Sequence, residues 1–386
     1  MNKLIPYGHQ CIEGDDIQAV VEVLRSDFLT QGPKVKEFEE ALAEYCGAKY
    51  AVSFSSGTAA LHGAYFAAGL GSKDEIITSP ITFLSTSNAG LFLRGRPVFV
   101  DVEPDTGNID AELIAPAVTG NTKAIVPVHF AGHPANLKRI AEIARKYNLM
   151  VVEDACHALG ARYLDTTIGD CKYSDMAVFS FHPVKSITTG EGGAVLTNSK
   201  EYYERLVVFR HHGITKDKNA FVNKDEDAGR WYYEMQHLGY NYRLTDIQCA
   251  LGISQLKKLG RFIRKRRRIV NAYNQAFKGN SFFDMPVEKS GVESAWHLYA
   301  IRLKDAYKRV KPKLFEELHQ RQLGVQVHYI PVHLQPYYQR LGYSQDLCPK
   351  AKDFYERQIS VPIYPAMSDE DVEYVISGLL DVLKHS

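Results

Sequence analysis

The segment Leu149-Met150-Val151-Val152-Glu153 is a short, mostly apolar run, and Asp154 stands at its end. A second run, Asp175-Met176-Ala177-Val178-Phe179-Ser180, leads into Phe181-His182-Pro183-Val184-Lys185. Short runs of this kind, with helical patterns between them, are typical of parallel strands that are buried on both faces. Similar runs lie at residues 50–54, 75–79, 97–101, 123–129 and 193–197. We therefore expect an α/β fold with a mostly parallel central sheet.

The composition excludes several classes of protein. The chain has 386 residues, 45% of them hydrophobic, and a net charge of +1, so it is long enough for a large core and has no charge bias toward nucleic acid or membranes. No Cys-x-x-Cys pair occurs, so we predict neither a metal site nor a redox dithiol. The first residues carry no apolar leader, and no long apolar run follows, which favours a cytoplasmic protein.

The pattern changes after Leu244. A long helical stretch starts at Thr245, and it is followed by fewer strands (residues 296–303 and 325–329) and by helices at residues 313–322 and 369–383. We predict a large α/β domain over residues 1–244 and, over residues 245–386, a linking helix with a small α+β domain. The long helix carries a basic run at Arg261 and residues 264–268. Only Phe262 intervenes in this run and no known motif is present, so a solvated helix face is favoured over a nucleic-acid surface.

Two segments at strand ends carry candidate chemistry. In an open parallel sheet, ligands bind beyond the carboxyl ends of the strands. Ser55-Ser56-Gly57-Thr58 opens a predicted helix, where free N–H groups suit a phosphate; the alternative is a simple N-cap. Asp154 suits a protonated ring nitrogen, and its alternative is also an N-cap. His157 suits a ring contact or a structural role, and Glu153 is expected to face the opposite side of the sheet.

Two further segments follow in the chain. After the strand that ends at Ser180, Lys185 suits a Schiff base with an aldehyde cofactor, whereas most loop lysines are solvated surface charges. The segment Gly239-Tyr240-Asn241-Tyr242-Arg243 offers an amide and a guanidinium to a phosphate, or is a surface turn. Each signal is weak alone, but a serine, an aspartate and a lysine that converge on one cofactor would explain their order.

The ordered motifs S-G-T, E-D-A-x-x-A, F-S-F-H-x-x-K, E-G-G and G-x-N-x-R resemble those of the DegT-type sugar aminotransferases, over nearly the whole chain. That resemblance implies pyridoxal 5′-phosphate (PLP) as the cofactor and the aspartate aminotransferase-like fold, type I. It also implies that Lys185 forms the Schiff base, that Asp154 binds the pyridine nitrogen and that His157 lies near the ring hydroxyl. Further cofactor contacts implied by position come from Ser56, Gly57, Thr58, Phe83, Ser180 and, toward a partner subunit of a homodimer, Asn241.

Five further segments resemble the family members that act on UDP-linked 4-keto-6-deoxy-N-acetyl sugars, with L-glutamate as amino donor. They are residues 29–32, 156–160, 180–182, 187–189 and 326–329. The resemblance implies a sugar pocket lined by Tyr7, Phe28, Leu29, Thr30, Gln31, Ser56, Ser180, Gln326, Val327, His328 and Tyr329. His328, His333 and Arg230 are candidates for the diphosphate. Related sugar dehydratases carry histidine at the lysine position, so Lys185 favours transamination. Open alternatives are another 4-keto nucleotide sugar, a PLP-binding regulator without turnover and a non-enzymatic scaffold.

Overall fold

A central mixed sheet organises the first two thirds of the chain. The computed structural model describes residues 4–223 and 229–385. The prediction that the N-terminal segment carries no apolar leader therefore falls partly, at residues 1–3, outside the described residues. Within the described part, the sheet has seven strands in the order β2-β10-β9-β6-β5-β3-β4, and only β10 is antiparallel to its neighbours. Their bounds are β2 Tyr50–Phe54, β3 Glu75–Thr78, β4 Arg96–Phe99, β5 Thr122–Val126, β6 Met150–Asp154, β9 Met176–Ser180 and β10 Gly193–Thr197. These are the seven predicted strands, and the mostly parallel α/β fold is confirmed.

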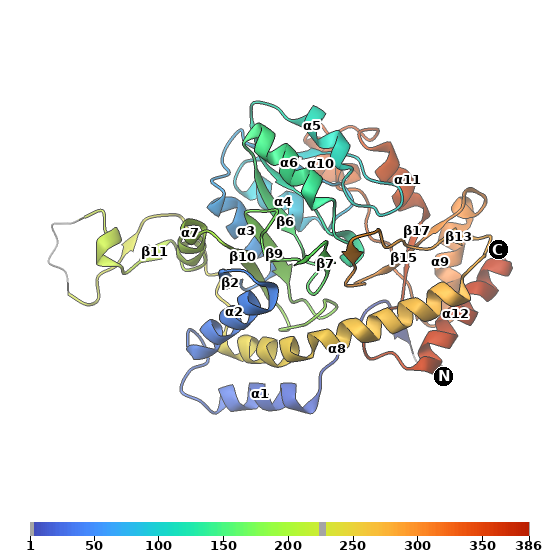
Figure 1. The fold of residues 1–386 in the computed structure, drawn as a ribbon, viewed down its shortest axis with the longest axis horizontal. Coiled ribbons are helices and arrows are strands. Elements are labelled where there is room, and N and C mark those ends of the chain that lie inside the picture. Colours follow the sequence, from blue (N-terminus) through green and yellow to red (C-terminus); the bar gives the residue numbers. More distant parts are fainter. Residues whose placement is uncertain (1–3, 224–228, 386) are drawn as a thin grey trace.

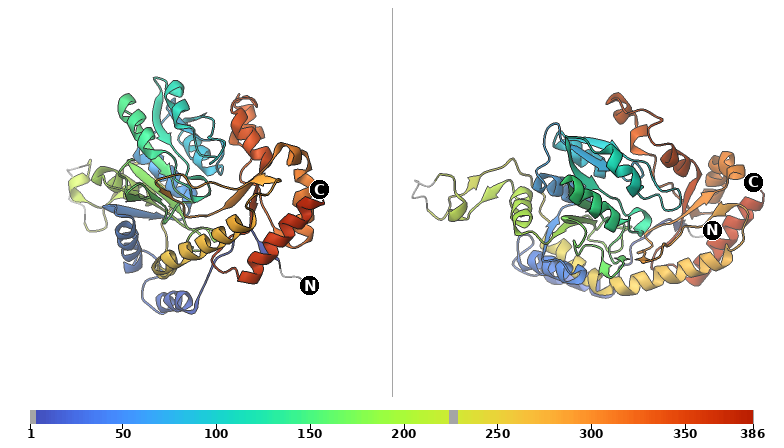
Figure 2. Two further views of the ribbon diagram at one scale, coloured as in Figure 1. Left: turned by 45° about the vertical axis from the view of Figure 1, so that its right-hand side comes forward. Right: turned by 45° about the horizontal axis from the view of Figure 1, so that its top comes forward.

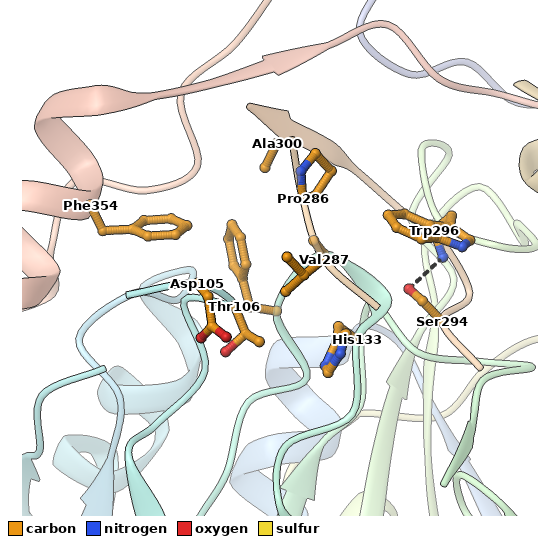
Figure 3. Close-up of a pocket in the computed structure, with 11 residues that line it drawn as sticks. Asp105, Thr106, His133, Pro286, Val287, Ser294, Trp296, Ala300 and Phe354 are labelled. Atoms are coloured by element: carbon orange, nitrogen blue, oxygen red, sulfur yellow. Dashed lines mark hydrogen bonds between the residues drawn. The ribbon is translucent and has the colours of Figure 1, made fainter. Parts of the chain in front are cut away.

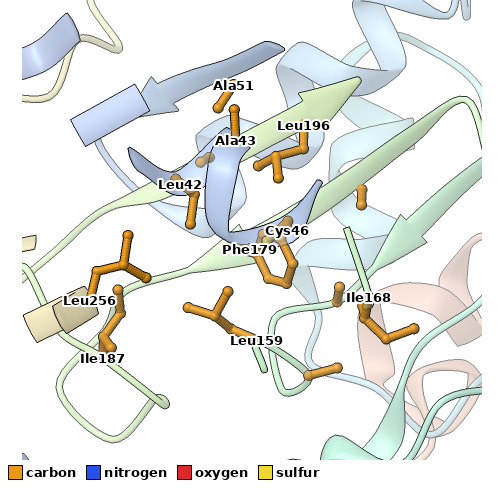
Figure 4. Close-up of a cluster of buried hydrophobic side chains, with 14 of the residues drawn as sticks. Leu42, Ala43, Cys46, Ala51, Leu159, Ile168, Phe179, Ile187, Leu196 and Leu256 are labelled. Atoms are coloured by element: carbon orange, nitrogen blue, oxygen red, sulfur yellow. The ribbon is translucent and has the colours of Figure 1, made fainter. Parts of the chain in front are cut away.

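Alternate residues of these strands enter different cores. Val178 and Val195 pack under α3 (Gly57–Ala67) and α7 (Lys200–Arg210), while Phe179 and Leu196 pack on the opposite face. Figure 4 shows the second of these clusters, to which α2 (Pro33–Cys46) and α8 (Asp246–Ala276) contribute Leu42 and Leu256. Because successive side chains of a strand point to opposite faces, both faces must be apolar and covered by helices. The helices α4 (Ser85–Phe92) and α6 (Leu137–Tyr147) complete the layers around the sheet.

The 31-residue helix α8 connects this sheet to the C-terminal part of the chain (Figure 1). It begins with a capping box at Thr245, contributes Leu259 to the core beneath the sheet and, further along, Tyr273 to the C-terminal core. That core surrounds a three-stranded antiparallel sheet of β13 (Phe283–Asp284), β15 (Tyr299–Leu303) and β17 (Gln358–Val361), with α9 (Lys311–Gln320) and α12 (Asp369–Lys384). Figure 2 shows this part beside the large sheet.

The N-terminal segment lies against the C-terminal part. β1 (Ile5–Pro6) pairs in parallel with β16 (Leu323–Gly324), and Ile5 is buried in the C-terminal core. Helix α1 (Gly14–Leu24) then packs on α8. The division at residue 244 therefore stays a prediction, since α8 belongs to two cores and the N-terminal strand joins the second.

Two local predictions are wrong. The strand expected at residues 325–329 is absent: β16 ends at Gly324, and beyond it only Gln326 bridges to Ser360. The main-chain N–H of His328 donates to the Gln358 side chain instead of a strand neighbour, which turns this segment toward a cavity. The basic run is not one solvated face either, because Arg266 is only 1% exposed. In the part of the chain that the structure describes, every helix is too short or too polar to span a bilayer.

Candidate active site

A cavity of about 780 Å³ opens at the carboxyl ends of β6 and β9. One wall comes from the strand ends and the helix start after β2, and the other from Tyr7 and the segment after β16. The predicted site residues that line it are Tyr7, Ser56, Gly57, Thr58, Phe83, Asp154, His157, Ser180, Lys185, Gln326, Val327, His328 and Tyr329. The fold therefore brings together residues from three of the four segments that local patterns indicate, those around Ser56, Asp154 and Lys185.

The Asp154 carboxylate is held at the end of β6. It is 5% exposed, and its Oδ2 accepts a hydrogen bond from Thr86 Oγ1 at 2.6 Å, while its Oδ1 accepts from the main-chain N–H of Cys156 at 3.2 Å. No helix starts at the following residue, so the N-cap alternative for Asp154 is wrong. Glu153 faces the other side of the sheet as predicted, where His129 Nε2 lies 2.7 Å from its Oε2. Asp154 is therefore a buried, oriented carboxylate directed into the cavity.

The Lys185 amine faces the same cavity. The side chain is half-buried, because one side opens into the cavity and protein surrounds the others. This burial lowers the pKa of the amine, and nearby Cys156 and Asp154 only partly oppose the shift. Among the described residues, Lys185 forms no ion pair, and Asp154 acts on its pKa only through its charge. The surface-charge alternative is thus wrong, and the site holds an amine with an increased neutral fraction.

The start of α3 forms a cradle for an anion. Ser56 caps the helix by accepting from the Ala59 N–H at 3.1 Å, so the N-cap interpretation is correct, and the same residues line the cavity. A Cβ atom on Gly57 would lie 2.9 Å from the Cβ of Ser180, so a side chain there would fill the cradle. A glycine at a helix N-terminus, flanked by hydroxyls, matches the shape and charge of a phosphate group.

The rings of His157 and His328 line the same cavity. His157 is 6% exposed, and its Nε2 lies 3.1 Å from the Tyr329 hydroxyl. Burial, followed by the Lys185 charge, holds the pKa of His157 well below its usual range. Burial also lowers the pKa of His328 to about 3. Both rings are therefore neutral at physiological pH and act as hydrogen-bonding or stacking groups.

Other predicted residues lie outside this cavity. Phe28 and Leu29 are 54% and 45% exposed, Thr30 pairs with Thr245, and Asn241 pairs with His211; these residues and Gln31 are not part of the lining. His333 is fully buried beside Phe99 and also lies outside the lining, as does Arg230.

Sequence reasoning missed Thr86, Cys156 and His297, which line the cavity. Thr86 lies within a polar helical stretch and carried no signal, whereas His297 was assigned to a strand whose observed start is Tyr299.

A lysine amine, a buried carboxylate and a helix-start anion cradle, all at the carboxyl edge of a mostly parallel sheet, define a PLP-dependent transferase of fold type I. Within that class, residues 10–380 match the model of the DegT/DnrJ/EryC1/StrS aminotransferase family, and the chain belongs to this family. It is a nucleotide-sugar aminotransferase of the DegT type.

Individual relatives match over almost their full length. The chain is 42% identical to "Uncharacterized protein MJ1066" of Methanocaldococcus jannaschii and 39% identical to the UDP-4-amino-4,6-dideoxy-N-acetyl-beta-L-altrosamine transaminase of Campylobacter jejuni serotype O:23/36, each covering 99% of this chain and 98% of the relative. Among solved structures it is similar to Helicobacter pylori PseC, an aminotransferase involved in the biosynthesis of pseudoaminic acid (TM-score 0.92, 35% identity, 100% of both chains). The PLP form of Streptococcus pneumoniae Spr1654, a putative sugar aminotransferase in its published description, has a TM-score of 0.92 at 30% identity over 99% of both chains.

The cavity residues fit PLP, the cofactor of this family. The α3 cradle matches the phosphate, the amine of Lys185 matches the aldehyde and the carboxylate of Asp154 matches the ring nitrogen. A further polar atom, Nδ1 of His157, is buried without a hydrogen-bond partner in the described structure. These side chains therefore provide groups that suit the phosphate, the aldehyde and the ring nitrogen of PLP.

Proposed function

We propose that this enzyme transfers the amino group of L-glutamate to C4 of UDP-2-acetamido-2,6-dideoxy-β-L-arabino-hex-4-ulose. The products would be UDP-4-amino-4,6-dideoxy-N-acetyl-β-L-altrosamine and 2-oxoglutarate, a step of pseudaminic acid biosynthesis. The observation that carries amino transfer is the Lys185 amine, which faces the cavity with a lowered pKa and no ion pair among the described residues. The sugar itself is supported by full-length similarity to a transaminase named for the proposed product and to an aminotransferase of pseudoaminic acid biosynthesis.

The residues of the cavity have separate tasks in this reaction. Bound PLP supplies a carbonyl that takes up the amino group and a ring that accepts electron density from the donor's Cα. Lys185 anchors the cofactor and, when its amine is released, moves the proton at the donor's Cα. Asp154 keeps the ring nitrogen protonated, while Ser56, Gly57 and Ser180 hold the phosphate. The lowered pKa of Lys185 suits this task, since only the neutral amine accepts a proton.

The second wall of the cavity is the proposed sugar pocket. Tyr7 and His328 are in ring contact at 5.1 Å, and the His328 Nδ1 lies 2.9 Å from Ser360 Oγ. Gln326 and Tyr329 line the same wall. These groups offer amide, hydroxyl and imidazole contacts to a sugar ring and its diphosphate, and a cavity of about 780 Å³ is within the usual size of ligand sites.

We also infer a homodimer in which each copy completes the other's site. The segment that includes β11 (Ile214–Thr215) and β12 (Glu234–Met235) projects away from the rest of the chain (Figures 1 and 2). It exposes large apolar side chains, with Trp231 at 80% and Leu238 at 75%. Exposed apolar surface of this extent fits a protein interface. Asn241 follows this segment and lies outside its own chain's cavity, so we propose that it reaches the partner's cofactor phosphate.

The test is product analysis. The purified, PLP-loaded enzyme is incubated with L-glutamate and, in parallel, with the proposed UDP sugar, a UDP-linked 4-keto-arabinose and a GDP-linked 4-keto-hexose. We expect amination at C4 of the first sugar, identified by mass and NMR, together with 2-oxoglutarate. Amination of only another sugar would refute the substrate but keep the reaction. Binding of PLP without amino transfer to any sugar would support a regulator instead.

A further inference from the structure

His297 is a buried group that the proposed mechanism does not use. It is 4% exposed and lines the cavity, and the centroid of its ring lies 4.2 Å from that of His157 at an interplanar angle of 38°. The Nδ1 atoms of both rings are buried and have no hydrogen-bond partner in the described structure. Two contacting imidazoles with unsatisfied nitrogens are an unusual arrangement, because buried polar atoms are nearly always paired.

The main chain that carries His297 is constrained on several sides. Trp296 has a φ of +49°, a left-handed conformation that a bulky residue rarely adopts. The main-chain N–H of Trp296 donates to Ser294 Oγ at 3.0 Å (Figure 3). Gly132 packs against the same main chain: a Cβ atom there would lie 2.9 Å from the carbonyl oxygen of His157 and 3.0 Å from the main-chain nitrogen of His297. The two histidine segments thus meet at a glycine. Strained backbone that its surroundings fix in this way is typical of functional positions.

Arg266 fixes the same segment from α8. Its guanidinium is 1% exposed, and Nη1 donates to the carbonyl oxygens of Trp296 and His297 at 3.2 Å each and of Ile363 at 2.9 Å. Within the described part of the chain, Arg266 forms no ion pair with a carboxylate. The buried cation therefore acts on the main chain of this segment rather than as half of a salt bridge.

The surroundings of His297 also keep its ring neutral. Burial is the first cause that holds the pKa of His297 well below its usual range, and the neighbouring groups His157, Lys185, Arg266 and His328 act in the same direction. A neutral ring can pack closely against the neutral His157 ring without electrostatic repulsion.

We propose that His297 is a positioning residue whose ring holds the imidazole of His157 in place against PLP. Arg266, Gly132 and the left-handed Trp296 place the His297 ring, and that ring in turn restricts the His157 ring. This inference rests on the proposed function and on the contact with the ring hydroxyl of PLP that the family resemblance implies for His157. It assigns His297 an effect on the cofactor that passes through another side chain.

A double-mutant cycle on PLP affinity tests this inference. The variants are His297→Ala, His157→Ala, the double variant and His297→Phe, which keeps a ring. We expect His297→Ala to weaken PLP binding by roughly 5- to 50-fold, a range that contacting residues typically show. The double variant should bind PLP no more weakly than His157→Ala, and His297→Phe should restore most of the affinity. The dissociation constant is measured by titrating the apoprotein, and thermal unfolding of each apoprotein monitors the fold.

The matched control is His133→Ala. His133 is also a buried histidine, but it lines a separate cavity of about 20 Å³ beneath Trp296 and Phe354, which has room for about one water molecule (Figure 3). This control should lose stability without losing PLP affinity. Additive effects of His297→Ala and His157→Ala would refute the positioning role while leaving the role of His157 intact. An unchanged PLP affinity in His157→Ala would refute both the proposed contact and this inference.

Discussion

Replacing Thr86 with valine tests whether one hydroxyl holds Asp154 in its working orientation. Thr86 lies fully buried on α4, 2.6 Å from Asp154 Oδ2 and 2.7 Å from Thr82 Oγ1. A hydroxyl has one proton, and the carboxylate can only accept, so Thr82 donates to Thr86 and Thr86 donates to Asp154. Valine keeps the shape of threonine but removes this donor, which leaves the N–H of Cys156 as the other donor to Asp154 in the described structure.

The expected magnitude follows from the charge on Asp154. A hydrogen bond to a charged group contributes about 1.5–3 kcal/mol. At about 2.1 cal/mol/K per residue, the unfolding entropy of 386 residues is about 0.8 kcal/mol/K, so the Tm of the apoprotein should fall by about 2–4 °C. If an equal free energy is lost in the transition state relative to the enzyme–substrate complex, kcat should fall by roughly 10- to 150-fold.

The assay compares Thr86→Val with Thr86→Ser, which retains the hydroxyl and loses only a methyl group. Calorimetry of the apoproteins gives Tm, and amino transfer at saturating PLP gives kcat. The serine variant should stay close to the parent in both. A valine variant with parental Tm and kcat, or a serine variant that loses as much as valine, would refute the argument that the hydroxyl orients Asp154.

Three further predictions address the site and the fold. Lys185→Ala should lose both the covalent anchor of PLP and the proton transfer, and proton transfer alone contributes roughly 10²–10⁴-fold to the rate. Borohydride should trap PLP on the parent and not on this variant. Near-parental turnover would contradict the role assigned to Lys185. Asp154→Ala should still bind PLP but lose about 10²–10³-fold in kcat, which steady-state kinetics checks, because a preorganised charge is removed; an unchanged kcat would remove Asp154 from its role. His62 is buried among aromatic rings, and burial lowers its pKa to about 4. The neutral His62 ring stabilises the fold fully above its unfolded pKa near 6.5, and this contribution is lost as the pH falls toward about 4. When the pH is lowered from about 7.5 to about 4.5, the Tm of His62→Phe should therefore rise relative to the Tm of the parent. A pH-independent Tm difference would show that His62 does not titrate in this way.

The large sheet could be predicted from the sequence because its signals are local. A strand that is buried on both faces must be apolar throughout, so β6 and β9 appear as short apolar runs between polar residues. The start of α8 was equally readable, since the Thr245 capping box is a property of four consecutive residues. The wall formed by the strand ends could be predicted for the same reason, because the carboxyl ends of neighbouring parallel strands must meet at one edge of the sheet.

The second wall could not be predicted from local patterns. The segment after β16 has an apolar and aromatic composition that suits a strand, yet the main chain of His328 pairs with the Gln358 side chain. Arg266 stands among five other basic residues that look alike in sequence, and only the packing of α8 on residues 296–297 shows that this one is buried. His297 gave no sign of its contact with His157, because the contact depends on the left-handed conformation of Trp296. These contacts form between segments that are distant in the sequence, so the local pattern of apolar and polar residues does not predict them.

The division of the cavity into two walls has a consequence for specificity. Asp154, Ser180 and the α3 cradle stand on a sheet whose strands are fixed by cores on both faces, so their relative positions cannot change without disturbing those cores. Tyr7 and His328 stand instead on segments outside regular strands, joined to the C-terminal core by the β1–β16 pairing. If the sugar binds to this wall as proposed, we expect substitutions here to change which sugar is accepted while the amino-transfer chemistry of the first wall is preserved. Two residues outside the large sheet contact His157 at the strand ends: Tyr329 through its hydroxyl, and His297, which lies beside the small sheet, through its ring. A change that displaces His297 should therefore alter PLP binding even when every residue of the strand ends is intact, and this link between the walls is what the double-mutant cycle measures.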